Sequence, residues 1–232
     1  MLTLYIGNKN YSSWSMRPWV LLKQADIAFR EVMVRFDAFN SPDSEFKRTI
    51  LAINPGGRVP VLVDDGFAVW DTLAIAEYLA EYAAEHFPEH ALWPRDQTDR
   101  ARARSLCAEM HSGFGALRSA CPMNIEASLP EVGARVLDAQ PAVAADLARI
   151  CAMWQAALAA SGGPFLFGSV GIVDAYFAPV VARLRTYALP VPADVAAYMQ
   201  RVWASPGVAA WVADALAEQD FLDFEEPYRT CA

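Results

Sequence analysis

A proline at the entrance of a β-branched run is the feature that most constrains this chain, because residues 54–62 have the sequence NPGGRVPVL. Proline cannot donate to a sheet ladder, so Pro60 must begin an edge segment or occupy a special turn, and X-Pro bonds adopt the cis form at low cost. We expect a cis Val59–Pro60 bond that turns the backbone N–H and C=O of Val59 outward. Those two groups are then free to pair with an extended peptide.

A helix start follows eleven residues after Pro60, at Asp71-Thr72 before a periodic apolar stretch. This pattern is typical of a helix N-terminus, where unpaired N–H groups and the positive end of the helix dipole favour a negative charge. A peptide lying along Val59 would reach this helix with a carboxylate. The two features together predict a peptide-binding site.

Composition argues against several classes of partner. The chain has 232 residues and is 55% hydrophobic, which is enough for one large or two small domains. A formal charge of −8, with basic residues interspersed among acids, disfavours nucleic acid. The sequence has no uncharged apolar run of about 18 residues and no signal-peptide pattern, so we expect no membrane partner and a cytoplasmic location.

The cysteines and histidines show no metal-ligand spacing. The four cysteines form no CxxC pair and the three histidines no HExxH pattern, so we expect reduced thiols and no metal site. The residues concerned are Cys107, Cys121, Cys151, Cys231, His86, His90 and His111.

The first 83 residues alternate between strand and helix patterns. Residues 2–6 and 31–35 alternate as strands do, and residues 14–24 between them have apolar side chains at helical spacing. This βαβ unit predicts two parallel strands. Residues 60–63 and 67–69 predict a hairpin, and residues 72–82 a closing helix. The order describes an α/β, thioredoxin-like domain over residues 1–83.

Strand patterns stop after a linker at residues 84–96, and long alanine-rich amphipathic stretches follow. We expect helices over residues 98–118, 141–160, 172–187 and 193–204, which make residues 97–232 an all-α domain. Near the start of the third helix, Asp174 can accept from the backbone N–H of Gly171 as half of a capping box. The predicted role of Asp174 is therefore structural.

One further motif gives the chain a family resemblance: Tyr11-Ser12-Ser13-Trp14-Ser15-Met16-Arg17-Pro18-Trp19. Together with the features at Pro60 and Asp71-Thr72, Leu92-Trp93-Pro94 and the segment at 168–179, it makes nearly the whole chain resemble the glutathione S-transferases. The resemblance is greatest to a bacterial serine-type branch near the theta and zeta classes. It implies glutathione as cosubstrate, conjugation to small, mostly apolar electrophiles in detoxification, and a homodimer.

The resemblance places thiol activation at the start of the first helix. Glutathione reacts as the thiolate, whereas a free thiol with a pKa of about 8.5 is mostly protonated at neutral pH. A hydroxyl donor at a helix N-terminus lowers that pKa. Counting back from Arg17 puts Ser12 at the activating position, with Ser13 as second candidate and Tyr11 or Tyr5 as alternatives. The serines could instead only cap the helix.

The same resemblance implies a glutathione site made of Trp14, Arg58, Val59, Pro60, Asp71 and Thr72. The Val59 backbone would pair with the cysteinyl part, Asp71 would hold the γ-glutamyl ammonium, and Thr72 would hold the neighbouring carboxylate. Most relatives carry Glu or Gln where this chain has the shorter Asp71. Arg58 would hold the glycine carboxylate, or else be a solvated surface residue.

The electrophile pocket is expected between the domains, on a helix that carries Met110, His111, Phe114 and Arg118. Met110, Phe114 and Arg118 would share one face of that helix. Such a stripe is also typical of plain core.

Two other functions stay open. One is a glutathione-dependent isomerase, although zeta-class isomerases have Cys where this chain has Trp14. The other is a non-catalytic, glutathione-transferase-like binding or regulatory protein. A thiol transferase is disfavoured, because the first 106 residues contain no cysteine.

Overall fold

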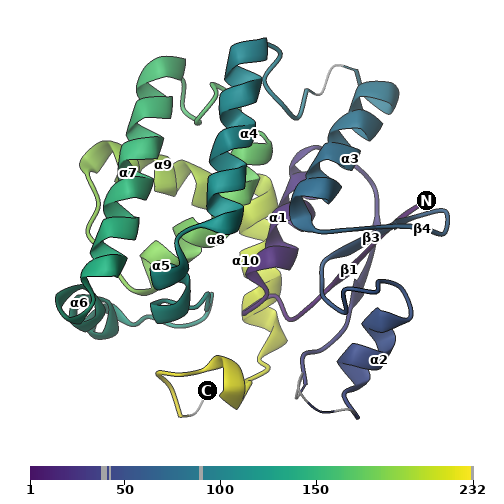
Figure 1. The fold of residues 1–232 in the computed structure, drawn as a ribbon, viewed down its shortest axis with the longest axis horizontal. Helices are drawn as coiled ribbons and strands as arrows, with labels where there is room; N and C mark the ends of the chain where they lie inside the picture. The colour runs from purple at the N-terminus through teal and green to yellow at the C-terminus, as the bar shows by residue number, and fades with distance from the viewer. Residues whose placement is uncertain (38–40, 42, 89–90, 231–232) are drawn as a thin grey trace.

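The structure is a computed structural model, and it describes residues 1–37, 41, 43–88 and 91–230. His90 and Cys231 lie outside these residues. In Figure 1 the sheet with α2 and α3 forms one side of the molecule, and the helices α4 to α9 form the other. Helices α1 and α10 lie between the two sides and pack against each other.

The N-terminal half contains a four-stranded sheet in the order β2-β1-β3-β4. As expected, β1 pairs with β2 in parallel, and the other two pairings are antiparallel. Alternate residues of β1 face opposite sides, so Leu2, Leu4 and Ile6 enter the main core while Tyr5 packs beside α2. The elements are β1 (Leu2–Ile6), α1 (Ser13–Gln24), β2 (Arg30–Met33), α2 (Glu45–Leu51), β3 (Val61–Asp64), β4 (Phe67–Trp70) and α3 (Thr72–His86).

Helices α2 and α3 differ from the sequence-based expectation. The short α2 was not predicted; it is capped by the Ser44 hydroxyl, which accepts from Lys47 N at 3.0 Å. Helix α3 extends to His86, so the first three residues of the expected 84–96 linker are helical. The Tyr82 carbonyl lies 2.9 Å from His86 Nδ1, a contact within this last turn.

The C-terminal half is helical, as predicted. Helices α6 and α10 were not predicted. Each begins with a proline, which the first helical turn accommodates because its missing N–H has no partner there in any case. The elements are α4 (Gln97–Ser112), α5 (Gly115–Ala120), α6 (Pro130–Ala139), α7 (Pro141–Ser161), α8 (Ile172–Thr186), α9 (Ala193–Ala204), α10 (Pro206–Glu218) and the 3₁₀ turn η1 (Asp223–Glu225).

The expected single helix over residues 98–118 is wrong, because α4 ends at Ser112 and α5 begins at Gly115. Phe114 between them adopts the left-handed conformation, with φ of 57°. A Cβ at Gly113 would lie 2.7 Å from the Glu109 carbonyl oxygen, so glycine permits this close approach. Residues 113 and 114 therefore separate α4 from α5.

Helix α8 lies at the centre of a core that spans both halves, packing against α1, α4 and α9. Asp174 in its first turn accepts from Gly171 N at 3.0 Å, which confirms the predicted capping contact. Helix α7 is the one described helix with the length and composition to cross a membrane, and it packs against α5, α6 and α9 in this fold. Such a core helix is weak evidence for a membrane span.

Candidate active site

A cavity of about 460 Å³ opens between the two halves of the molecule. The segment before β3, the start of α3, the start of α1 and the α4–α5 region all contribute to it. Its lining residues are Trp14, Asn54, Gly56, Arg58, Val59, Pro60, Trp70, Asp71, Thr72, His111 and Arg118. The structure therefore brings together all six residues predicted for glutathione and two of the four predicted for the electrophile.

The segment before β3 is shaped by Asn54. Its Oδ1 accepts from Gly56 N at 2.8 Å and its Nδ2 donates to the Arg58 carbonyl at 3.0 Å, so one buried amide closes the turn from both sides. The Val59–Pro60 bond is cis, as predicted. In the part of the chain that the structure describes, no hydrogen bond is made by the Val59 N–H or C=O. This edge of the cavity offers backbone groups to an extended ligand.

The start of α3 forms the next wall. Asp71 is the N-cap, with its Oδ1 accepting from Leu73 N at 2.9 Å, and its φ of 72° is strained for a residue other than glycine. Thr72 is buried, and its hydroxyl shares a 2.7 Å hydrogen bond with the Tyr176 hydroxyl from α8. Leu73 N is thus used by the cap, whereas no described hydrogen bond uses the Thr72 N–H at the start of the helix.

A chain of side-chain contacts joins the start of α3 to the helical half. His111 Nε2 lies 3.4 Å from Asp71 Oδ2, and His111 Nδ1 lies 2.8 Å from the Tyr176 hydroxyl. The Trp14 ring stacks at a tilt on His111, with centroids 5.2 Å apart. Residues from four elements thus fix the position of Asp71 and Thr72.

The two candidate serines lie beside the cavity and not in its lining. Ser12 is the N-cap of α1 by backbone, but its hydroxyl makes no capping bond, so the alternative of a merely capping side chain is wrong for Ser12. The hydroxyl instead donates to Ser15 Oγ at 2.7 Å, and Ser15 Oγ also accepts from Gly7 N. Ser13 Oγ accepts from Arg183 Nη2 at 3.3 Å. A thiol held next to Trp14 would meet the same helix end.

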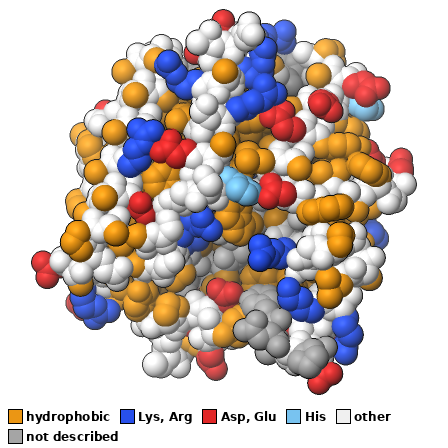
Figure 2. All heavy atoms as spheres, viewed as in Figure 1, with side chains coloured by type: hydrophobic (Ala, Val, Ile, Leu, Met, Phe, Trp, Pro, Cys, Tyr) orange, Lys and Arg blue, Asp and Glu red, His pale blue; other side chains and the backbone are white. Residues whose placement is uncertain are grey.

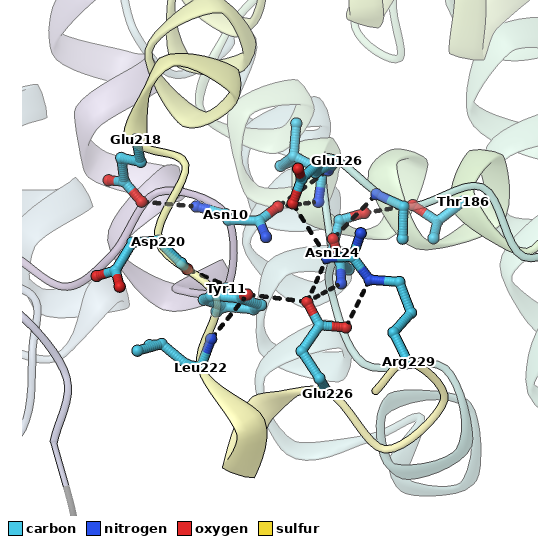
Figure 3. Close-up of polar contacts among 12 residues, drawn as sticks. Asn10, Tyr11, Asn124, Glu126, Thr186, Glu218, Asp220, Leu222, Glu226 and Arg229 are labelled. Carbon is cyan, nitrogen blue, oxygen red and sulfur yellow. Dashed lines mark hydrogen bonds and ion pairs between the residues drawn. The ribbon is translucent and has the colours of Figure 1, made fainter. Parts of the chain in front are cut away.

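The Tyr11 hydroxyl, which was an alternative to Ser12 for thiol activation, is hydrogen-bonded outside the cavity. It donates to Glu226 Oε1 at 2.8 Å and accepts from Leu222 N at 3.3 Å, and burial raises the pKa of Tyr11 to about 12. Figure 3 shows Tyr11, Asn124 and Arg229 all directed at the Glu226 carboxylate. Tyr11 therefore holds the C-terminal segment at 218–229 and does not reach a ligand.

That C-terminal segment secures the loop that carries Ser12. Glu218 accepts from the backbone N–H of Lys9 at 2.7 Å, and Asp220 accepts from the Asn8 side chain at 2.9 Å. Asn10 extends the attachment to the helical half by accepting from the N–H groups of residues 125 and 126. The position of the α1 N-terminus thus depends on contacts more than 100 residues away in sequence.

The surroundings of Trp14 are strongly basic. Arg17 is buried, donates to the Ser13 and Tyr176 carbonyls, and lies 4.1 Å from the Trp14 ring centroid. Burial lowers the pKa of Arg17 to about 9 and that of Arg183 to about 10, and both guanidinium groups stay cationic at neutral pH. Their positive charges add to the helix dipole at the α1 N-terminus.

Met110 and Phe114 were predicted to line the electrophile pocket, and this prediction is wrong, since neither lines the cavity. Both are buried in the main core, which is the plain-core alternative that the sequence left open for this stripe. His111 and Arg118 alone of that predicted set line the cavity. The lining residues that sequence reasoning missed are Asn54, Gly56 and Trp70, of which Asn54 could have been found from the NPGG turn.

A second and larger cavity, of about 580 Å³, lies at the linker. None of the predicted catalytic or ligand-binding residues lies among the described residues that line it. Its buried carboxylate, Asp174, already accepts from Gly171, Leu166 and Tyr198. The candidate chemistry therefore belongs to the smaller cavity.

The fold and the first cavity define a two-domain protein in which a thioredoxin-like domain presents a peptide edge and a helix N-terminus to a helical domain. Residues 11–82 match the family model of the glutathione S-transferase N-terminal domain, and residues 137–214 match that of the C-terminal domain. The chain belongs to the glutathione S-transferase family.

Similar proteins agree with this assignment. A glutathione transferase homologue from Burkholderia, solved with bound glutathione, is 28% identical, with a TM-score of 0.69 over 92% of this chain and 97% of that one. A probable maleylacetoacetate isomerase of Caenorhabditis elegans is 32% identical over 50% of this chain and 49% of its own length. The maleylacetoacetate isomerase of Pseudomonas aeruginosa is 32% identical over 53% and 55%. The chain matches about half the length of these curated relatives.

Proposed function

We propose that this protein activates the thiol of glutathione and transfers it to a small electrophile, as a glutathione transferase. The observation that carries the proposal is the cavity wall on which the unpaired Val59 backbone, Asp71 and the α3 N-terminus lie together. Val59 would pair with the cysteinyl part, Asp71 with the γ-glutamyl ammonium, and Thr72 and the helix N–H groups with the carboxylate. The exposed Arg58 would hold the glycine carboxylate.

Ser12 is the proposed activating residue. The Ser12 hydroxyl donates to Ser15 Oγ at 2.7 Å, and rotation about its Cβ–Oγ bond would direct the same proton at a bound thiolate. A hydrogen bond to a charged group contributes about 1.5–3 kcal/mol. Since one pKa unit is about 1.36 kcal/mol, loss of this bond would raise the thiol pKa by roughly one to two units.

The thiolate absorbance of bound glutathione, titrated against pH, tests this role. We expect an upward shift of the titration in Ser12→Ala, with nearly unchanged glutathione affinity. Tyr11→Phe serves as control, because the Tyr11 hydroxyl is bonded to Glu226. An unchanged titration in Ser12→Ala together with a shift in Ser13→Ala would transfer the role to Ser13.

An isomerase is the second candidate, favoured by the names of the two relatives that match about half of this chain. A substrate screen with glutathione separates the two reactions, since conjugation consumes the thiol and isomerisation regenerates it. Retention on glutathione-agarose without turnover would instead favour a non-catalytic binding protein.

We also propose a cytoplasmic homodimer that serves in detoxification. Exposed hydrophobic side chains gather over β4 and α3 in Figure 2, and Phe67 and Trp70 of β4 are among the large exposed ones. A two-fold interface would bury them against the helical half of a second copy. Sedimentation as a single 25.5 kDa species at micromolar concentration would refute the dimer.

A further inference from the structure

The helical half contributes two residues to the described lining of the cavity, His111 and Arg118. All the other lining residues come from the N-terminal half, where the proposed glutathione site lies. The second substrate must therefore lie against a wall made of an imidazole and a guanidinium. The apolar residues expected on that wall, Met110 and Phe114, are packed in the core.

Arg118 has hydrogen-bonding capacity to spare. Its Nη1 donates to the Gly113 carbonyl at 3.2 Å, its guanidinium carbon lies 5.1 Å from the Trp14 ring centroid, and no described carboxylate forms an ion pair with it. A guanidinium carries five N–H donors in a fork that fits a carboxylate bidentately. Most of these donors are open to a ligand in the cavity.

Two further guanidinium groups lie near Arg118 and add to the positive charge of its surroundings. Arg183 is buried and donates to the Arg118 carbonyl at 3.1 Å and to the Cys121 carbonyl at 2.6 Å, which fixes the short helix α5. Arg17 also lies over the Trp14 ring, with its guanidinium carbon 4.1 Å from the ring centroid. The acid in the cavity lining, Asp71, already caps α3 and faces His111. An anion next to Arg118 is therefore favoured by three guanidinium groups.

We propose that the electrophile is a carboxylate-bearing compound, whose carboxylate Arg118 binds while its reactive carbon lies beside Trp14. The proposal rests on the proposed transferase function and names its substrate class. Arg58 remains for the glycine carboxylate of glutathione, so the two arginines of the lining have separate anions to hold.

A matched pair of electrophiles tests the inference: 4-chloro-3-nitrobenzoate and the neutral, nearly isosteric 4-chloro-3-nitrobenzamide. In both, the glutathione thiolate forms a C–S bond at the chlorine-bearing carbon, chloride leaves with the C–Cl electron pair, and the thiol proton goes to solvent. Arg118→Gln should lower kcat/KM for the benzoate by about tenfold to a hundredfold, the range expected for one charge-assisted contact. The loss for the benzamide should be at least tenfold smaller.

The comparison between variants cancels the different intrinsic reactivities of the two compounds. Arg118→Lys should retain part of the benzoate rate, because it keeps the charge but not the fork. Arg149→Gln is the control for net charge, since Arg149 is exposed and paired with Glu109 away from the cavity. Equal losses for both electrophiles in Arg118→Gln would overturn the proposal.

A binding measurement tests the role of Arg118 if no turnover is observed. Calorimetry would compare 3-nitrobenzoate with 3-nitrobenzamide in the wild type and in Arg118→Gln, with and without glutathione. A benzoate preference that is lost in Arg118→Gln supports the inference, and equal affinities overturn it. Failure of the wild type to bind glutathione would refute the proposed function alone, because the measurement without glutathione still tests Arg118.

Discussion

Replacement of Asp174 by asparagine should destabilise the protein much more at acid pH than at neutral pH. The Asp174 side chain is 2% exposed, and its two oxygens accept from Gly171 N, Leu166 N and the Tyr198 hydroxyl. Asparagine replaces one acceptor oxygen by a donor NH₂ group, so at least one of the three donors loses its partner. An unsatisfied buried donor costs about 1–3 kcal/mol.

The pH dependence follows from the titration of the carboxyl group. Burial raises the pKa of Asp174 to about 6, in spite of the hydrogen bonds that favour ionisation. In the unfolded chain the pKa of this carboxyl group is about 3.9. The folded state therefore binds the Asp174 proton more tightly than the unfolded state does. This proton binding stabilises the fold below about pH 4, and the stabilisation is lost as the pH rises through about 6. The difference of about two units corresponds to about 3 kcal/mol, which Asn cannot contribute because it does not titrate.

Urea unfolding followed by tryptophan fluorescence at pH 4 and pH 7.5 measures the effect. The destabilisation by Asp174→Asn should be about 2–3 kcal/mol larger at pH 4. Asp138→Asn, at an exposed position of α6, should change stability by less than about 0.5 kcal/mol at either pH. Equal destabilisation at the two pH values would mean that Asp174 is ionised in the fold at pH 4, and would refute the reasoning.

Two further substitutions test contacts that only the tertiary structure shows. Hydrogen bonds from Arg229, Tyr11 and others outweigh burial and lower the pKa of Glu226, so its stabilisation is present above the unfolded pKa of about 4.3 and lost as the pH falls. Glu226→Gln should cost about 1.5–3 kcal/mol at pH 7 and less at pH 3.5, and a pH-independent loss in thermal unfolding would contradict this. A Cβ at Gly133 would lie 1.9 Å from the Tyr187 carbonyl oxygen, so Gly133→Ala should cost about 1–3 kcal/mol or more. Gly115→Ala, with open space around the new methyl group, should be close to neutral by urea unfolding, and equal effects of the two would refute the packing argument.

The sequence by itself determined the features that depend on local pattern. The βαβ order, the hairpin, the turn before Pro60 and the helix start at Asp71-Thr72 all follow from strand and helix periodicity and from the chemistry of proline and capping residues. The capping role of Asp174 was predictable for the same reason, because the N-cap and third helical positions lie within one turn. Val59, Pro60, Asp71 and Thr72 of the cavity lining lie on these features, whereas Trp14 and Arg58 were assigned to the site by the family resemblance.

The tertiary structure decided which side chains meet. Of the four residues predicted for the electrophile pocket, His111 and Arg118 line the cavity, whereas Met110 and Phe114 lie in the core. The break at Phe114 was not predicted, since the helical period up to Ser112 gives no indication of a left-handed residue beyond it. The contact of Tyr11 with Glu226 joins residues 215 positions apart. Contacts at such separations leave no periodic trace in the sequence, because they depend on how whole helices pack and not on the conformation of either segment.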